Sequence, residues 1–105
     1  MNQENKTIEI EQMLTLSTNN ISEEDCKWLD VQSALTKRNE MYELIVYLKG
    51  DYGFFIPLSD SVLERSASIP NTLAVVIGYA IAKGCSWIMF DQDAQVNKDL
   101  PFFEW

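Results

Sequence analysis

Histidine is absent from all 105 residues of the sequence. Imidazole is the commonest general base in enzymes and the commonest neutral metal ligand, so Ser-His-Asp and Cys-His catalysis are excluded. Glycine is also scarce, with four residues, and there is no Walker loop, no Gly-x-Gly-x-x-Gly motif and no nucleophile elbow. The sequence therefore has too few glycines to favour a phosphate-binding loop. We expect a non-enzymatic protein that needs no cofactor.

Cysteine motifs and long apolar runs are absent as well. Cys26 and Cys85 lie in different predicted elements, and no CxxC or metal-type spacing surrounds them, so we expect two reduced thiols. The N-terminus lacks the basic, apolar and small-residue order of a leader peptide, and no apolar run approaches the ~20 residues that a membrane span needs. We expect a cytoplasmic protein without a membrane partner.

Basic side chains are half as frequent as acidic ones. Eight Lys and Arg residues oppose sixteen Asp and Glu residues, which gives a formal charge of −8. Nucleic acid is itself a polyanion, so direct binding to it is disfavoured. The charge suits a basic protein surface, including one that normally holds DNA or RNA, although many acidic proteins are merely soluble. Charge alone leaves both interpretations open.

The first part of the chain predicts a strand and then a helix. Apolar and polar residues alternate over residues 8–16, which indicates a strand with one solvated face. Ser22 and Asp25 have the spacing of a capping box, so a helix should begin there, and Asn39 should end it. The predicted buried stripe of this helix comprises Trp28, Val31 and Leu35.

The second part of the chain predicts a hairpin, a helix and a last strand. Residues 43–49 and 52–57 are rich in strand-forming side chains around Gly50-Asp51, which favours a type II′ turn with Lys49 opposite Tyr52. The connection that follows has at most a short helical turn. A second helix should then run from Pro70, with Asn71 as its cap, to a stop at Gly84. Residues 86–91 form the last predicted strand.

These elements predict one α+β domain over residues 1–105, with residues 1–5 disordered. The order βαββαβ fits a two-layer sandwich with an antiparallel sheet, most simply of the ferredoxin-like type. In that arrangement the last strand is an edge and one sheet face lacks helices. The second and fourth predicted strands, however, show no polar face. We therefore expect the sheet face that lacks helices to be covered, either by the tail 100–105 or by a second copy of the protein in a homodimer.

Three groups of residues are candidates for a site. Asp91 and Asp93 end the last strand two residues apart and can hold Mg²⁺ or Ca²⁺, although an aspartate there also commonly turns the chain. The acidic first turn of the helix can face a basic partner or simply cap the helix. The aromatic tail suits core or interface packing better than base stacking, because only Lys49 lies near the aromatic residues. The candidates for partner binding are Glu23, Glu24, Asp25, Phe102, Phe103 and Trp105.

Three stretches resemble a known family. The first is residues 17–21 (Ser-Thr-x-x-Ile), and the second is residues 52–56 (Tyr-Gly-Phe-Phe-Ile). The third is residues 83–105, which begins with Lys-Gly-Cys-Ser-Trp-Ile, continues with Asp-x-Asp and ends with Leu-Pro-x-Phe-x-Trp. The chain is similar there to small acidic bacterial proteins of unknown function carried on plasmids, prophages and integrative elements. Members often have a histidine where this chain has Asn20. The resemblance implies no catalytic residue, but carriage on mobile elements implies a protein that binds and blocks a host system.

The leading hypothesis is therefore a non-enzymatic cytoplasmic accessory protein, an inhibitor encoded by a mobile element, that presents acidic surface to a basic, nucleic-acid-handling protein partner. The alternative is a small metal-dependent enzyme or metal-binding module that uses Asp91 and Asp93.

Overall fold

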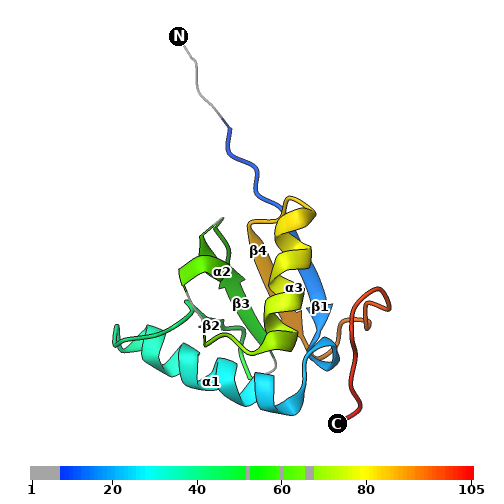
Figure 1. Ribbon diagram of the computed structural model, residues 1–105, viewed down its shortest axis with the longest axis horizontal. Helices are drawn as coiled ribbons and strands as arrows, with labels where there is room; N and C mark the ends of the chain where they lie inside the picture. The colour runs from blue at the N-terminus through cyan, green and yellow to red at the C-terminus, as the bar shows by residue number, and fades with distance from the viewer. Residues whose placement is uncertain (1–7, 52, 60, 66–67) are drawn as a thin grey trace.

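The computed structural model describes residues 8–51, 53–59, 61–65 and 68–105. The predicted disorder of residues 1–5 falls outside these ranges. Helices and strands follow one another in the predicted order, with a 3₁₀ helix added after the first strand and a short helix added before the last long one (Figure 1). The elements are β1 (Met13–Ser17), the 3₁₀ helix η1 (Thr18–Asn20), α1 (Glu23–Lys37), β2 (Tyr47–Leu48), β3 (Gly53–Pro57), α2 (Val62–Arg65), α3 (Asn71–Ala82) and β4 (Trp87–Asp91).

The α+β class is confirmed, and the sheet is mixed where an antiparallel sheet was predicted. Its four strands have the order β1-β4-β3-β2, with β1 parallel to β4 and the other neighbours antiparallel. The ferredoxin-like strand order is not confirmed, because the first strand takes the edge and the last strand lies inside the sheet. A strand as apolar as β4 suits an inner position, whereas β1 places exposed Met13 and Thr15 at the edge.

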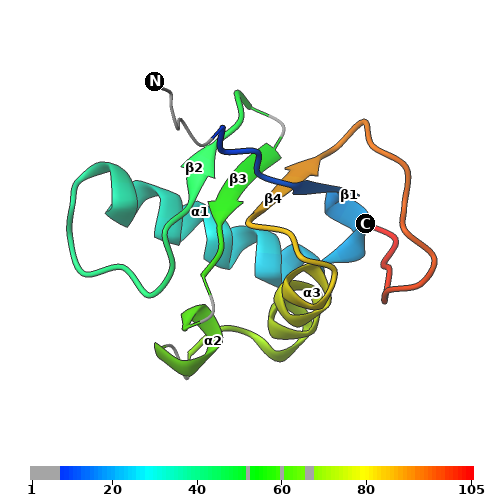
Figure 2. The same cartoon turned by 90° about the horizontal axis from the view of Figure 1, so that it is seen from above.

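Both long helices lie on the same face of the sheet (Figure 2). The strands direct Leu16, Phe54, Ile56, Ile88 and Phe90 toward this face, and all five side chains belong to the buried core. Helix α3 contributes a buried stripe to the same core. Of the described residues, none forms a helix long and apolar enough to cross a membrane.

None of the helices formed by the described residues lies on the opposite face of the sheet (Figure 2). Phe55, Trp87 and Met89 are half-buried there, and Tyr47 is exposed. The tail does not cover this face, because Phe103 and Trp105 hydrogen-bond to the segment around η1 instead. Pairing through this face with a second copy of the protein stays a prediction.

The start of α1 follows the sequence closely, but its buried face does not. Ser22 Oγ accepts the N–H of Asp25 at 3.0 Å, and Asp25 Oδ2 accepts the N–H of Ser22 at 3.2 Å, so the capping box is present. Val31 was predicted to be buried and is 55% exposed. The helix buries Gln32 instead, because its Oε1 accepts the N–H groups of residues 43 and 44.

The hairpin register differs by one residue from the prediction. Lys49 N–H donates to the carbonyl of Gly53 at 2.9 Å, so Lys49 lies opposite Gly53 and not Tyr52. Opposite residues in a sheet share a face. The observed register pairs outward Tyr47 with outward Phe55, whereas the predicted register would have placed inward residues opposite outward ones.

Two element boundaries also differ from the prediction. Residues 8–12 were expected to belong to the first strand, but the strand begins at Met13, and Ile8 and Ile10 are exposed. Helix α3 has Pro70 in the N-cap position, and Asn71 is its first helical residue. Gly84, with φ of +80°, follows the end of this helix as predicted.

Gly53 permits the close approach of β3 and β4. A Cβ atom at this position would collide with the carbonyl oxygen of Phe90. We therefore expect Gly53→Ala to lower the free energy of unfolding by about 2 to 3 kcal/mol, the usual range for overpacking. Urea denaturation measures this change.

Gly78→Ala is the matched control, because among the described residues a Cβ atom there would meet Leu63 Cδ1 alone, at an ordinary contact distance of 3.8 Å. This variant should gain about 0.5 to 1 kcal/mol from the better helix propensity of alanine. A neutral Gly53→Ala variant would contradict the tight β3–β4 contact.

Candidate functional site

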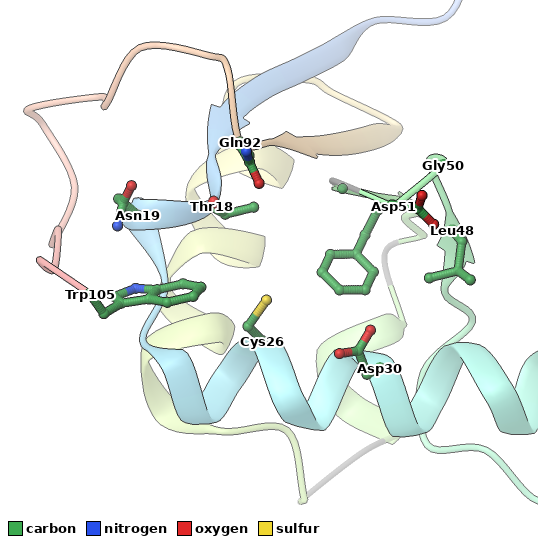
Figure 3. Close-up of a pocket in the computed structure, with 11 residues that line it drawn as sticks. Thr18, Asn19, Cys26, Asp30, Leu48, Gly50, Asp51, Gln92 and Trp105 are labelled. Carbon is green, nitrogen blue, oxygen red and sulfur yellow. The ribbon is translucent and has the colours of Figure 1, made fainter.

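A cavity lies where β1 and β4 end. Both strands of this parallel pair finish at the same edge of the sheet, and ligands commonly bind in the crevice outside such carboxyl ends. The cavity has a volume of about 570 Å³, within the usual range for ligand sites. Residues from five segments line it, among them Thr18, Cys26, Asp30, Asp51, Gln92 and Trp105 (Figure 3).

Helix α1 supplies one side of the cavity. Cys26 and Asp30 are four residues apart, so they lie on the same face of the helix, and both point toward the cavity (Figure 3). The preceding capping box fixes where this helix begins and therefore which face it turns to the cavity. The spacing of Cys26 and Asp30 was visible in the sequence, but it gained meaning only from the neighbouring strand ends.

The C-terminal tail supplies another wall of the cavity. Asn20 is fully buried, and its Nδ2 donates to the carbonyls of Asn97 and Pro101, each at 2.9 Å. Its Oδ1 accepts the N–H of Asn97 at 2.9 Å. This one side chain therefore satisfies three backbone groups of the tail, and both of its N–H groups and its oxygen have partners.

The end of the tail is held beside η1 by further hydrogen bonds. Asn19 and Phe103 exchange two of them, from Phe103 N–H to Asn19 O at 2.7 Å and from Asn19 Nδ2 to Phe103 O at 3.0 Å. Trp105 Nε1 donates to Ile21 O at 3.0 Å. The indole of Trp105 is thereby held at the cavity with half of its surface exposed.

The charged side chains of the cavity are acidic. Among the residues that the structure describes, its lining includes the carboxylates of Asp30 and Asp51 and no Lys or Arg. Over residues 8–51, 53–59, 61–65 and 68–105, neither carboxylate has a hydrogen bond or an ion pair. Lys49 is only two residues from Asp51, but it pairs with Asp91 at 3.2 Å. Within these ranges, the two cavity carboxylates therefore have no counter-ion from the protein.

The thiol of Cys26 experiences this negative potential. Burial raises the pKa of Cys26 above its ordinary value, and the carboxylates of Asp30, Asp25 and Glu23 raise it further. At neutral pH the side chain is consequently a thiol and not a thiolate. Because the thiolate is the nucleophilic form, Cys26 contributes a half-buried, weakly polar surface to the cavity and no reactive group.

The predicted metal pair forms a turn. Asp91 Oδ1 accepts the N–H of Asp93 at 2.9 Å, and Asp91 Oδ2 pairs with Lys49. Both oxygens of Asp91 are thus engaged, as expected of an aspartate that turns the chain after a strand. In the part of the chain that the structure describes, no three Cys, Asp or Glu side chains gather into a metal-binding group. Metal binding at Asp91 and Asp93 stays a prediction.

The predicted partner-binding residues occupy different environments. Glu23 and Glu24 are exposed on the first turn of α1, whereas Asp25 is buried and its carboxylate caps the helix. Phe102 is exposed and Phe103 is half-buried. Trp105 is the one candidate of this group that lines the main cavity. Sequence reasoning missed Asp30 and Asp51 as a site because their position in one cavity depends on how α1 crosses the hairpin.

The fold and this cavity define a small α+β domain with an acidic crevice at the carboxyl end of its parallel strand pair. The sequence matches, over residues 13–105, the family described as "Family of unknown function (DUF5983) C-terminal domain". The chain belongs to this family, which confirms its resemblance to a family of unknown function. No curated protein and no solved structure matches the chain.

Removal of the Asn20 side chain should strongly destabilise the fold. Asn20→Ala leaves two carbonyls and one N–H of the tail without their partner, and we expect a loss of about 3 kcal/mol in the free energy of unfolding by urea denaturation. Asn19→Ala is the control, since its side chain makes one such bond and should cost about 1 kcal/mol. Equal losses in the two variants would contradict the anchoring role of Asn20.

The Asp91 turn should make stability depend on pH in the acid range. The N–H of Asp93 and then the ammonium of Lys49 hold the pKa of Asp91 below its ordinary value of 3.8. The ionised carboxylate therefore stabilises the fold above that value, and this contribution is lost as pH falls through the folded-state pKa. We expect Asp91→Asn to lower the Tm at pH 7, and the difference from the wild type to shrink below pH 3.8.

Asp93→Asn is the control for this pH dependence, because the backbone of residue 93 makes the hydrogen bond. Its Tm should follow the wild type throughout. A difference between Asp91→Asn and the wild type that stays constant with pH would rule out the charge of Asp91 as its source.

Proposed function

We propose that this protein is a non-enzymatic binding domain that presents acidic surface to a basic protein partner. The observation that carries this proposal is the cavity with two carboxylates, Asp30 and Asp51, and no cation among the described residues of its lining. A surface that holds unpaired negative charge gains electrostatic energy when a positive surface docks on it. The formal charge of −8 extends the same preference over longer distances.

The acidic surface continues from the cavity along α1. Glu23 and Glu24 are exposed on the first turn of the helix that also carries Asp30. A partner that docks on this end of the molecule therefore meets carboxylates from the helix and from the β2–β3 turn together. This arrangement supports a basic protein as the partner and disfavours direct contact with nucleic acid, whose phosphates would be repelled.

Catalysis is the less supported alternative. The cavity has no histidine, its cysteine is protonated at neutral pH, and its carboxylates are open to solvent. We place the protein in the cytoplasm as an accessory factor of a mobile element that inhibits a basic, nucleic-acid-handling host protein. This more specific role follows from the charge and the family resemblance described above.

Affinity capture tests the proposed function. The wild-type protein, immobilised and exposed to lysate of the host organism at about 0.15 M salt, should retain a basic protein. The double variant Asp30→Asn/Asp51→Asn should lose it. The charge-matched control is Glu9→Gln/Glu64→Gln, which removes two exposed acids remote from the cavity and should retain the partner. Loss in both double variants, or in neither, would contradict partner binding through the cavity.

A further inference from the structure

The side chains that line the cavity are arranged along its length in an order that suits one type of ligand. Figure 3 shows the indole of Trp105 at one end, the Cys26 thiol next to it, then the Asp30 carboxylate, and Asp51 at the far end. The surface thus changes from aromatic and weakly polar at Trp105 to a region where the two carboxylates lie near the apolar side chain of Leu48. A complementary ligand has an apolar stem that ends in a cation.

Arginine and lysine are the amino acids with this form, since both have an aliphatic stem and a charged head. The two carboxylates come from different elements, Asp30 from α1 and Asp51 from the β2–β3 turn. A planar guanidinium has five N–H donors in a fixed fork and can bind carboxylates on two sides, whereas an ammonium is a compact and strongly hydrated point charge. Arginine also packs better on an aromatic ring.

We propose that the cavity receives the side chain of an arginine carried by the protein partner, with its guanidinium between Asp30 and Asp51 and its stem against Trp105. This proposal rests on the proposed function, because it names the group of the partner that the cavity recognises. Gln92 and Thr18 line the same space and offer uncharged oxygens to the remaining guanidinium N–H groups.

A second hollow, which shares Asn19 and Trp105 with the cavity, provides a contrast. It has a volume of about 440 Å³ and is lined by Lys98 and Glu104 together with the aromatic tail. Because both signs of charge are present there, it has no preference for a cation. The recognition of arginine should therefore belong to the Asp30–Asp51 side of Trp105 alone.

Blocked amino acids test this specificity without the partner. The probes are acetyl-arginine-amide, acetyl-lysine-amide and acetyl-citrulline-amide, the last being a neutral molecule of nearly the same shape as arginine. Their dissociation constants follow from the rise in Tm at increasing concentration. We expect a dissociation constant on the order of 1 mM for the arginine probe, as for a ligand of this size. Lysine should bind roughly tenfold more weakly, and citrulline should not bind.

Cavity variants locate the binding. Asp30→Asn and Asp51→Asn should each weaken the arginine probe by about tenfold or more, because each removes a charge-assisted hydrogen bond. Trp105→Leu should also weaken it, whereas Trp87→Leu should not, since Trp87 alternates with buried Ile88 along β4 and therefore lies on the opposite face of the sheet. The control Glu9→Gln/Glu64→Gln should bind like the wild type.

Three results would overturn the inference. Equal binding of the citrulline and arginine probes would mean that the cavity does not recognise charge. Unchanged binding by Asp30→Asn and Asp51→Asn would place the ligand elsewhere. Free arginine binding more than about tenfold tighter than the blocked probe would mean that the ligand is a free guanidino compound and not a side chain of a protein.

The two proposals fail in different ways. If the arginine probe binds in the cavity but the lysate yields no basic protein, the proposed partner is wrong and the preference of the cavity stands. If a basic protein is captured through Asp30 and Asp51 but the arginine probe does not bind, the inference is wrong and the proposed function stands.

Discussion

The buried amide of Asn20 is the constraint on which the candidate site depends. Its three hydrogen bonds join the end of η1 to Asn97 and Pro101, which lie 77 and 81 residues away along the chain. A polar side chain without solvent contact is tolerated only when its hydrogen bonds are satisfied, and this set satisfies both the amide and the tail backbone. The tail that Asn20 fixes also places Leu100 in the core and Trp105 at the cavity.

The parallel pairing of β1 with β4 brings the remaining parts of the cavity together. Because these two strands end at the same edge, Thr18 and Gln92 follow them directly into the cavity. The β2–β3 turn brings Asp51 to this edge, and α1 crosses beneath it with Cys26 and Asp30 (Figure 3). Core packing thus forms the cavity. Its negative charge comes from two surface carboxylates, Asp30 and Asp51, which make no hydrogen bonds within the described part of the fold.

Local features were predictable from the sequence, and long-range ones were not. The capping box of Ser22 and Asp25 and the apolar β4 strand depend on neighbouring residues, and both were predicted correctly. The hairpin register and the inner position of β4 depend on which faces of distant strands meet. The same holds for Asn20, since an asparagine next to a turn predicts turn chemistry unless the tail is known to return to it. The acidic cavity escaped prediction for this reason.

The recognition of an arginine side chain by the acidic cavity is the central claim, and an NMR titration tests it most directly. The protein has three tryptophans, Trp28, Trp87 and Trp105, whose indole N–H signals serve as separate reporters in ¹⁵N-labelled protein. On addition of acetyl-arginine-amide, we predict that the Trp105 signal shifts in a saturable way while that of Trp87, on the open sheet face, stays in place. A saturable shift at Trp87 with none at Trp105, or no shift at all, would contradict the account.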